Sequence, residues 1–92
     1  MTHVIRNETA SRFEATVEGQ LCIADYRLKG GVMVMPHTVV PPALQGRGIA
    51  AELVRTALEW ARAEGLKIEP LCSYVALYMR RHPETQDLLA HA

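Results

Sequence analysis

The most informative stretch of this sequence is a glycine-rich segment near its middle, Gln45-Gly46-Arg47-Gly48-Ile49-Ala50. Gly46 and Gly48 allow a tight bend and a close backbone approach, and the small Ala50 leaves room for a ligand against the first turn of a following helix. The first amides of a helix have no partner within it, and the helix dipole adds partial positive charge there. The segment therefore predicts an anion site suited to a pyrophosphate, with a charge-assisted contact from Arg47. The alternative is a connection in which the glycines serve only the turn.

Two other phosphate-binding patterns fit this segment less well. No Gly-Lys-Ser/Thr follows the glycines, which excludes a P-loop. The sequence offers one strand–helix–strand unit, which is too little for a dinucleotide-binding domain with its ribose-reading acid.

Two further side chains, expected near the glycine-rich segment, could act as a nucleophile or a base. Cys72 is expected at the end of a strand, just before Ser73 caps a helix, and a helix N-terminus lowers the pKa of a thiol. It is a candidate nucleophile or base, although cysteine is also a common small core residue. His37 lies on the strand that leads to the glycine segment and is a candidate base, although strand histidines are often structural.

Composition and charge exclude several classes of protein. Ten basic and ten acidic residues cancel, so the sequence has no electrostatic footprint for nucleic acid. No stretch approaches the length of a membrane span, and the opening residues hold no apolar run long enough for a signal peptide. Cys22 and Cys72 are not spaced as a disulfide framework and are expected to be reduced. His3, His82 and His91 show no metal-like spacing with them, so we expect no metal site. We expect one cytoplasmic domain, residues 1–92, that contacts neither nucleic acid nor membrane.

The first half of the chain must supply a sheet. A turn at Glu18-Gly19 and another at Lys29-Gly30-Gly31 separate apolar runs of strand length. The predicted strands are 13–17, 21–28 and 32–40, with a short opening strand at 4–6. Pro36 sits inside the third run and, since it has no N–H to donate, implies a bulge, an edge or the end of pairing.

The second half changes to helical periodicity. Apolar residues recur at helix spacing from Gly48 to Glu64, and Gly65 is well placed to end that helix. A short strand at 66–71, a helix from Ser73 to about Arg81 and a last short helix at 84–89 follow. The unit formed by the strand at 32–40, the long helix and the strand at 66–71 predicts a right-handed parallel crossover. The loop entering the long helix and the segment 72–74 should then share one rim of the sheet, where ligands bind.

At this point the residues resemble a known family. Gln45-x-x-Gly48-x-Ala50 is similar to the signature with which GNAT N-acetyltransferases cradle the coenzyme A pyrophosphate. The flanking segments 37–41, 70–75 and 78–84 look like those of small GNAT-like proteins that are known only as predicted acetyltransferases. The resemblance covers nearly the whole chain. It implies an α/β (α+β) fold, in which a mixed, mostly antiparallel sheet carries a long helix on one face and a short helical segment at the C-terminus.

The resemblance also implies a binding site and a set of roles. Acetyl-coenzyme A would contact the loop residues and the backbone of the strand before it, that is Val39, Val40, Gln45, Gly46, Arg47, Gly48, Ile49 and Ala50. Tyr78 resembles the helix tyrosine that acts as general acid in many members of the family, and its alternative is packing beside Tyr74. Only Asn7 to Ser11 separate the first two strands, which leaves no room for the helices that usually wall the acceptor pocket.

The leading functional hypothesis is therefore transfer of an acetyl group from acetyl-coenzyme A to an amine of a protein or small molecule. The catalytic candidates are Cys72, Tyr78 and His37. The alternative is a non-catalytic module that binds or senses acyl-coenzyme A through its open acceptor side. A thiol-based redox protein fits less well, because the sequence has no Cys-x-x-Cys.

Overall fold

The structure, a computed structural model, describes residues 2–90. Its strands are β1 Ile5–Asn7, β2 Arg12–Val17, β3 Gln20–Asp25, β4 Arg27–Lys29, β5 Val32–Met35, β6 Thr38–Val39 and β7 Lys67–Pro70. Its helices are α1 Ile49–Ala63 and α2 Ser73–Arg81, with 3₁₀ turns η1 Pro42–Leu44 and η2 Pro83–Leu88. The predicted long helix, the helix after Ser73 and the strand between them are all present, and the last short helix is a 3₁₀ segment.

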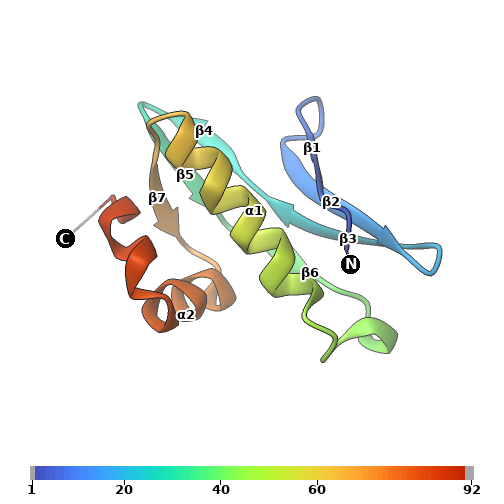
Figure 1. The fold of residues 1–92 in the computed structure, drawn as a ribbon. Coiled ribbons are helices and arrows are strands. Elements are labelled where there is room, and N and C mark those ends of the chain that lie inside the picture. The colour runs from blue at the N-terminus through green and yellow to red at the C-terminus, as the bar shows by residue number, and fades with distance from the viewer. Residues whose placement is uncertain (1, 91–92) are drawn as a thin grey trace.

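The strands form two sheets that share α1 as their cover (Figure 1). The first has the order β1-β2-β3-β6 and is antiparallel throughout. The second has the order β4-β5-β7, in which β5 and β7 run parallel. The fold is thus mixed and mostly antiparallel with a long helix on one face, as the sequence predicts, and β5–α1–β7 is the expected parallel crossover.

The single strand predicted over 32–40 is wrong, because the structure divides it between the two sheets. β5 ends opposite β7 at the pair Met35↔Pro70, and the Cys72 amide donates to Met35 O at 2.9 Å. After Pro36 the chain turns to β3 instead, where the Asp25 amide donates to His37 O at 2.9 Å. Proline cannot donate to a ladder, so pairing changes where it stands. Pro36 therefore marks the place at which β6 parts from β7.

The strand predicted over 21–28 is also divided, at Tyr26. The Tyr26 amide donates to Ser11 O at 3.0 Å, in register with the β2–β3 ladder, and β4 begins at the next residue. Its ring is buried, and its centroid lies 5.5 Å from that of Phe13 and 5.8 Å from that of Trp60. Tyr26 thus lies between two strands: its amide bonds to residue 11 and its ring packs in the core, while Arg27 begins β4 in the other sheet.

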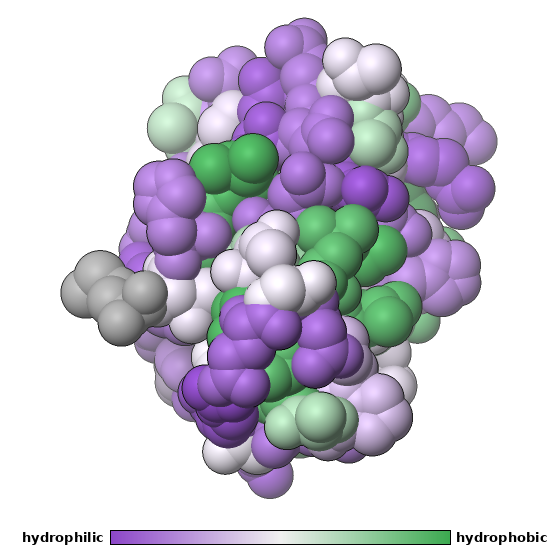
Figure 2. Space-filling view, turned by 90° about the vertical axis from the view of Figure 1, so that its right-hand side faces the viewer, coloured by the Kyte–Doolittle hydropathy of each residue, from purple (hydrophilic) through white to green (hydrophobic). Residues whose placement is uncertain are grey.

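The core lies between α1 and the inner faces of both sheets. Leu53, Val54 and Ala57 are fully buried on α1, against Phe13 of β2 and Ala24 of β3. The opposite face of the four-stranded sheet carries exposed apolar side chains, among them Ile5, Leu21 and Val39. Figure 2, which looks at the side of the molecule that bears β1–β3, shows apolar areas interrupted by polar side chains.

Candidate functional site

The loop that enters α1 has the backbone expected of an anion-binding turn. Gly46 and Gly48 both lie in the left-handed region, with φ of 82° and 79°. A Cβ at either position would meet no heavy atom within 4 Å, so glycine is needed there for conformation rather than for packing. Gly48 is the N-cap of α1, and the first helical bond runs from the Glu52 amide to Gly48 O at 3.1 Å. The amides of residues 49–51 therefore precede the helix ladder at its positive end.

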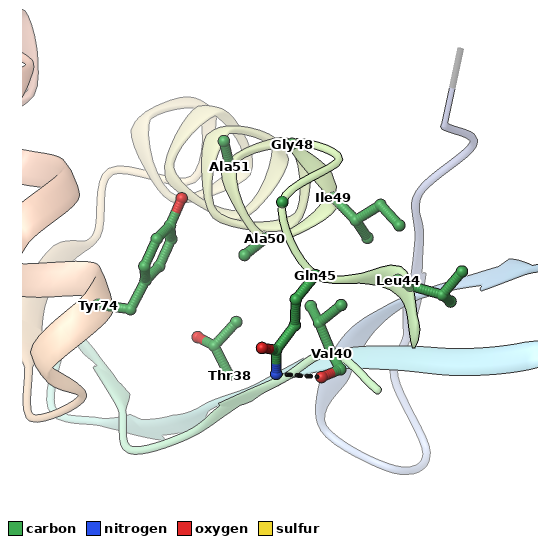
Figure 3. A pocket seen from close by; sticks show the side chains of 10 residues that line it. Thr38, Val40, Leu44, Gln45, Gly48, Ile49, Ala50, Ala51 and Tyr74 are labelled. Atoms are coloured by element: carbon green, nitrogen blue, oxygen red, sulfur yellow. Dashed lines mark hydrogen bonds between the residues drawn. The ribbon is translucent and has the colours of Figure 1, made fainter. Parts of the chain in front are cut away.

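A cavity of about 380 Å³ opens directly in front of these amides (Figure 3). Its walls come from β6, the loop, the first turn of α1 and the first turn of α2: Thr38, Val40, Leu44, Gln45, Gly46, Gly48, Ile49, Ala50, Ala51 and Tyr74. Gln45 Nε2 donates to Val40 O at 3.1 Å and ties the loop to the strand. The expected common rim is confirmed, because the loop and the start of α2 line the same cavity.

The strand at the floor of this cavity has one free edge. β6 pairs only with β3 among the strands of the described chain. Opposed residues of an antiparallel pair alternate between hydrogen-bonded and non-bonded, and the bond from the Asp25 amide to His37 O makes Ala24↔Thr38 a non-bonded pair. The backbone of Thr38 therefore points away from β3, whereas that of Val39 is used in the ladder. Thr38 and Val40 are the residues whose backbone groups face the gap between β6 and β7.

Cys72 lies across that gap, as the N-cap of α2. Its Sγ is 3.6 Å from Thr38 Oγ1. Burial raises the pKa of the Cys72 thiol, but the nearby backbone amides of Val75, Tyr74 and Thr38 and the Thr38 hydroxyl lower it by more. The net pKa is lowered below the ordinary thiol value. A thiolate at the N-terminus of α2 is thus stabilised by groups of both α2 and β6.

The two tyrosines of α2 lie in different cavities. Tyr74 lines the cavity in front of α1, with its ring on the side opposite Gln45 (Figure 3). Tyr78, the tyrosine that the resemblance selects, lines a second cavity of about 350 Å³ with Arg55 and Glu84, and its ring stacks on His82 at 3.9 Å between centroids. Burial raises the pKa of both phenols, which keeps both protonated near neutral pH.

Five predicted residues lie outside the cavity lining: Cys72 and Tyr78, described above, and His37, Val39 and Arg47. His37 is exposed, on the outer face of the sheet, and its Nδ1 is 3.8 Å from Asp25 Oδ2. Val39 also points outward, with 51% of its surface exposed. Arg47 does not line the cavity, and its Nη1 lies 2.8 Å from Glu18 Oε2 in the turn between β2 and β3.

Four residues that line the cavity were not predicted from the sequence: Thr38, Leu44, Ala51 and Tyr74. Leu44 is almost fully buried and closes the cavity beside the loop. Thr38 follows the proline at which β6 turns away, and Tyr74 follows the Ser73 start of α2. Their positions at element ends were visible, but which side of the gap they face depends on the division of the strand at Pro36.

Residues 2–90 contain no group of three or more His, Cys, Asp and Glu side chains arranged to hold a metal ion. His91, which the sequence gave no metal-like spacing, lies outside these described residues. Among the helices that the structure describes, none is long and apolar enough to cross a bilayer.

Comparison with known proteins gives a consistent result. A family model described as GCN5-related N-acetyl-transferase matches residues 12–88. Protein NATD1 of Gallus gallus is 39% identical over 57 residues, which are 62% of this chain and 52% of that protein. Protein NATD1 of Homo sapiens is 39% identical over 57 residues, 62% of this chain and 50% of that protein. The chain spans about half the length of these curated relatives. An NMR structure of a Staphylococcus aureus protein described as GCN5-like shares the fold, with a TM-score of 0.77 and 24% identity over 98% of this chain and 89% of that one.

Proposed function

Because this chain belongs to the GCN5-related N-acetyltransferase family, we propose that it binds acetyl-coenzyme A in the cavity between α1 and β6 and transfers the acetyl group to an amine. The observation that carries the proposal is the coincidence of two features at one cavity. Left-handed glycines expose the free amides of α1 at one end, and the free edge of β6 leads from there to Cys72. The first suits a pyrophosphate, and the second suits an extended arm with amide groups.

The pyrophosphate would lie against Gly46, Gly48 and the amides of residues 49–51. From there the pantetheine arm would run along Thr38 and Val40, whose backbone groups face the gap. The thioester would then reach the donors around Cys72. We thus assign the backbone contacts to Thr38 and Val40 instead of Val39 and Val40, because the register directs Thr38 rather than Val39 toward the gap.

The chemistry requires an unprotonated amine and a proton for the departing thiol. An ordinary lysine has a pKa near 10.4 and is only about 0.1% neutral at pH 7, so a base must assist it. Cys72 at the gap is the candidate base, whereas His37 lies on the outer face of the sheet and does not line the cavity. Amide donors at the start of α2 and on β6 would stabilise the oxyanion that forms when the amine attacks the carbonyl.

For the proton donor we propose Tyr74 in place of Tyr78. Tyr74 lines the cavity that we assign to the coenzyme, whereas Tyr78 stands one helical turn further along α2 and packs against His82. In a steady-state amine acetylation assay, Tyr74→Phe should lower kcat by about 10- to 100-fold. Tyr78→Phe should leave kcat within a factor of about three. The reverse order would restore Tyr78 as the acid.

Binding is tested first, by calorimetric titration with acetyl-coenzyme A. Gly48→Glu would place a side chain and a negative charge at the pyrophosphate and should abolish binding. Gly65→Glu is the matched control, since Gly65 has a left-handed φ of 72° at the other end of α1 and the same open surroundings. Both variants carry the same backbone strain, so loss of binding in Gly48→Glu only would support the site. A folded wild-type protein without affinity for acetyl-coenzyme A would overturn the proposal.

A non-catalytic module that binds acyl-coenzyme A is the second candidate. The observation that favours it is the connection between β1 and β2, a tight turn in which the Ser11 amide donates to Glu8 O at 3.2 Å. No helix from this connection walls the acceptor side. Binding of acetyl-coenzyme A without turnover of any primary amine would support this reading over the enzyme.

A further inference from the structure

The turn between β2 and β3 contains a residue that fits its backbone poorly. Glu18 has φ of 52° and is followed by Gly19 with φ of 76°, so both central residues of this two-residue turn are left-handed. Such turns favour asparagine, aspartate or glycine at the first position, because side chains without a short polar group crowd the backbone there. Sites where a sequence breaks a local rule in this way are often functional.

The Glu18 side chain reaches the loop in front of α1. Glu18 Oε2 lies 2.8 Å from Arg47 Nη1, and Arg47 stands between the left-handed Gly46 and Gly48. In Figure 1 the β2–β3 turn lies at the same end of the molecule as the loop that leads into α1. The one cation of the predicted pyrophosphate loop is thus already bound to a carboxylate, and it does not line the cavity.

We propose that Glu18 is an internal competitor for the coenzyme: it holds Arg47 outside the cavity until a pyrophosphate replaces it. This inference rests on the proposed function, since it assumes that acetyl-coenzyme A binds at this loop. A carboxylate and a pyrophosphate oxygen bind a guanidinium through the same charge-assisted hydrogen bonds. In this proposal, coenzyme binding replaces the contact between Glu18 and Arg47 with one between Arg47 and the pyrophosphate. Glu18 weakens the affinity for the coenzyme and accelerates its release.

The size of the effect follows from exposure. The side chains of Glu18 and Arg47 are 62% and 47% exposed. Exposed ion pairs contribute modestly, which corresponds to a change of about two- to fivefold in a binding constant. The contact is screened by salt, so the effect should shrink as ionic strength rises.

The test is calorimetric titration with acetyl-coenzyme A of Glu18→Gln, Arg47→Gln and the double variant. Glu18→Gln keeps the shape of the side chain and the strain of the turn, and should lower Kd by about two- to fivefold. In the Arg47→Gln background the same substitution should change nothing, because the residue that it releases is gone.

Glu8→Gln is the control for net charge. Glu8 lies in the β1–β2 turn and pairs with Arg6 at 3.6 Å, away from the cavity lining. It should leave Kd unchanged. Weaker or unaltered binding by Glu18→Gln, or an equal gain in Glu8→Gln, would overturn the inference while wild-type binding still supports the proposed function. Absence of binding by the wild type would instead refute the proposed function itself.

Discussion

Cys72 combines partial burial with polar groups on two sides. Its thiol donates to Thr38 Oγ1 at 3.6 Å, and the nearby amides of Thr38, Tyr74 and Val75 lower the pKa of that thiol. Cys22 provides the contrast within the same chain, because it is fully buried and burial raises its pKa. A cysteine at the end of a strand thus acquires its chemistry from the helix that it caps and from the strand across the gap.

This contrast predicts selective alkylation. The lowered pKa of Cys72 means a larger thiolate fraction at any pH below the ordinary thiol value of about 8.5. Iodoacetamide should therefore modify Cys72 at neutral pH, with a rate midpoint below 8.5, while Cys22 stays unmodified. Thr38→Val removes the hydroxyl donor and should move the midpoint upward. Peptide mass spectrometry across a pH series measures both rates, and equal modification of the two cysteines would contradict the prediction.

At the scale of elements, the helices were predictable and the course of the strands was not. α1 follows from apolar spacing and from the glycine at each end, and both are properties of a local window. The run Val32–Val40 carries no sign of the sheet to which each half belongs. It divides at Pro36 because the residues before it pair with β7 and those after it pair with β3, and both partners are distant in sequence. Likewise the run 21–28 divides at Tyr26, whose ring packs with Phe13 and Trp60, and these contacts are distant in sequence.

The candidate site was predictable to a similar extent. The glycine loop could be predicted because Gly46 and Gly48 set their own backbone conformation. The positions of the side chains could not, since Arg47 contacts Glu18 and Tyr78 lines a second cavity. The spacing of Tyr74 and Tyr78 put both on one face of a helix, but only the packing of α2 separates the tyrosine that borders the loop from the one that borders η2.

The β2–β3 turn yields a prediction about stability. Asn-Gly is the preferred pair for a two-residue turn with both residues left-handed. Glu18→Asn should relieve the strain at φ of 52° and raise the free energy of unfolding by about 0.5–1 kcal/mol, net of the lost ion pair. Urea denaturation measures the change. Glu18→Gln retains the strain and should show no gain, so equal stability of the two variants would mean that the turn is not strained.

At the scale of the whole molecule, ligand binding and stability are linked, because the cavity is built from the four-stranded sheet, the loop before α1 and both helices. Thr38 comes from the four-stranded sheet, Ala50 from α1 and Tyr74 from α2. A ligand that binds only the folded state stabilises it by about 2.7 kcal/mol at 100 times its Kd. For a chain of 92 residues each kcal/mol raises Tm by about 4–8 °C.

Acetyl-coenzyme A at that concentration should therefore raise Tm by about 10 °C or more, in a single transition if residues 1–92 form one domain as the sequence predicts. Differential scanning calorimetry of the wild type measures the shift, and Gly65→Glu should show the same shift from a lower starting Tm. Gly48→Glu should start equally low and not respond. A rise in the Tm of Gly48→Glu would place the ligand elsewhere. Two transitions, of which the ligand shifts only one, would mean that the two sides of the cavity unfold separately. The gap between β6 and β7 would then be a boundary between cooperative units.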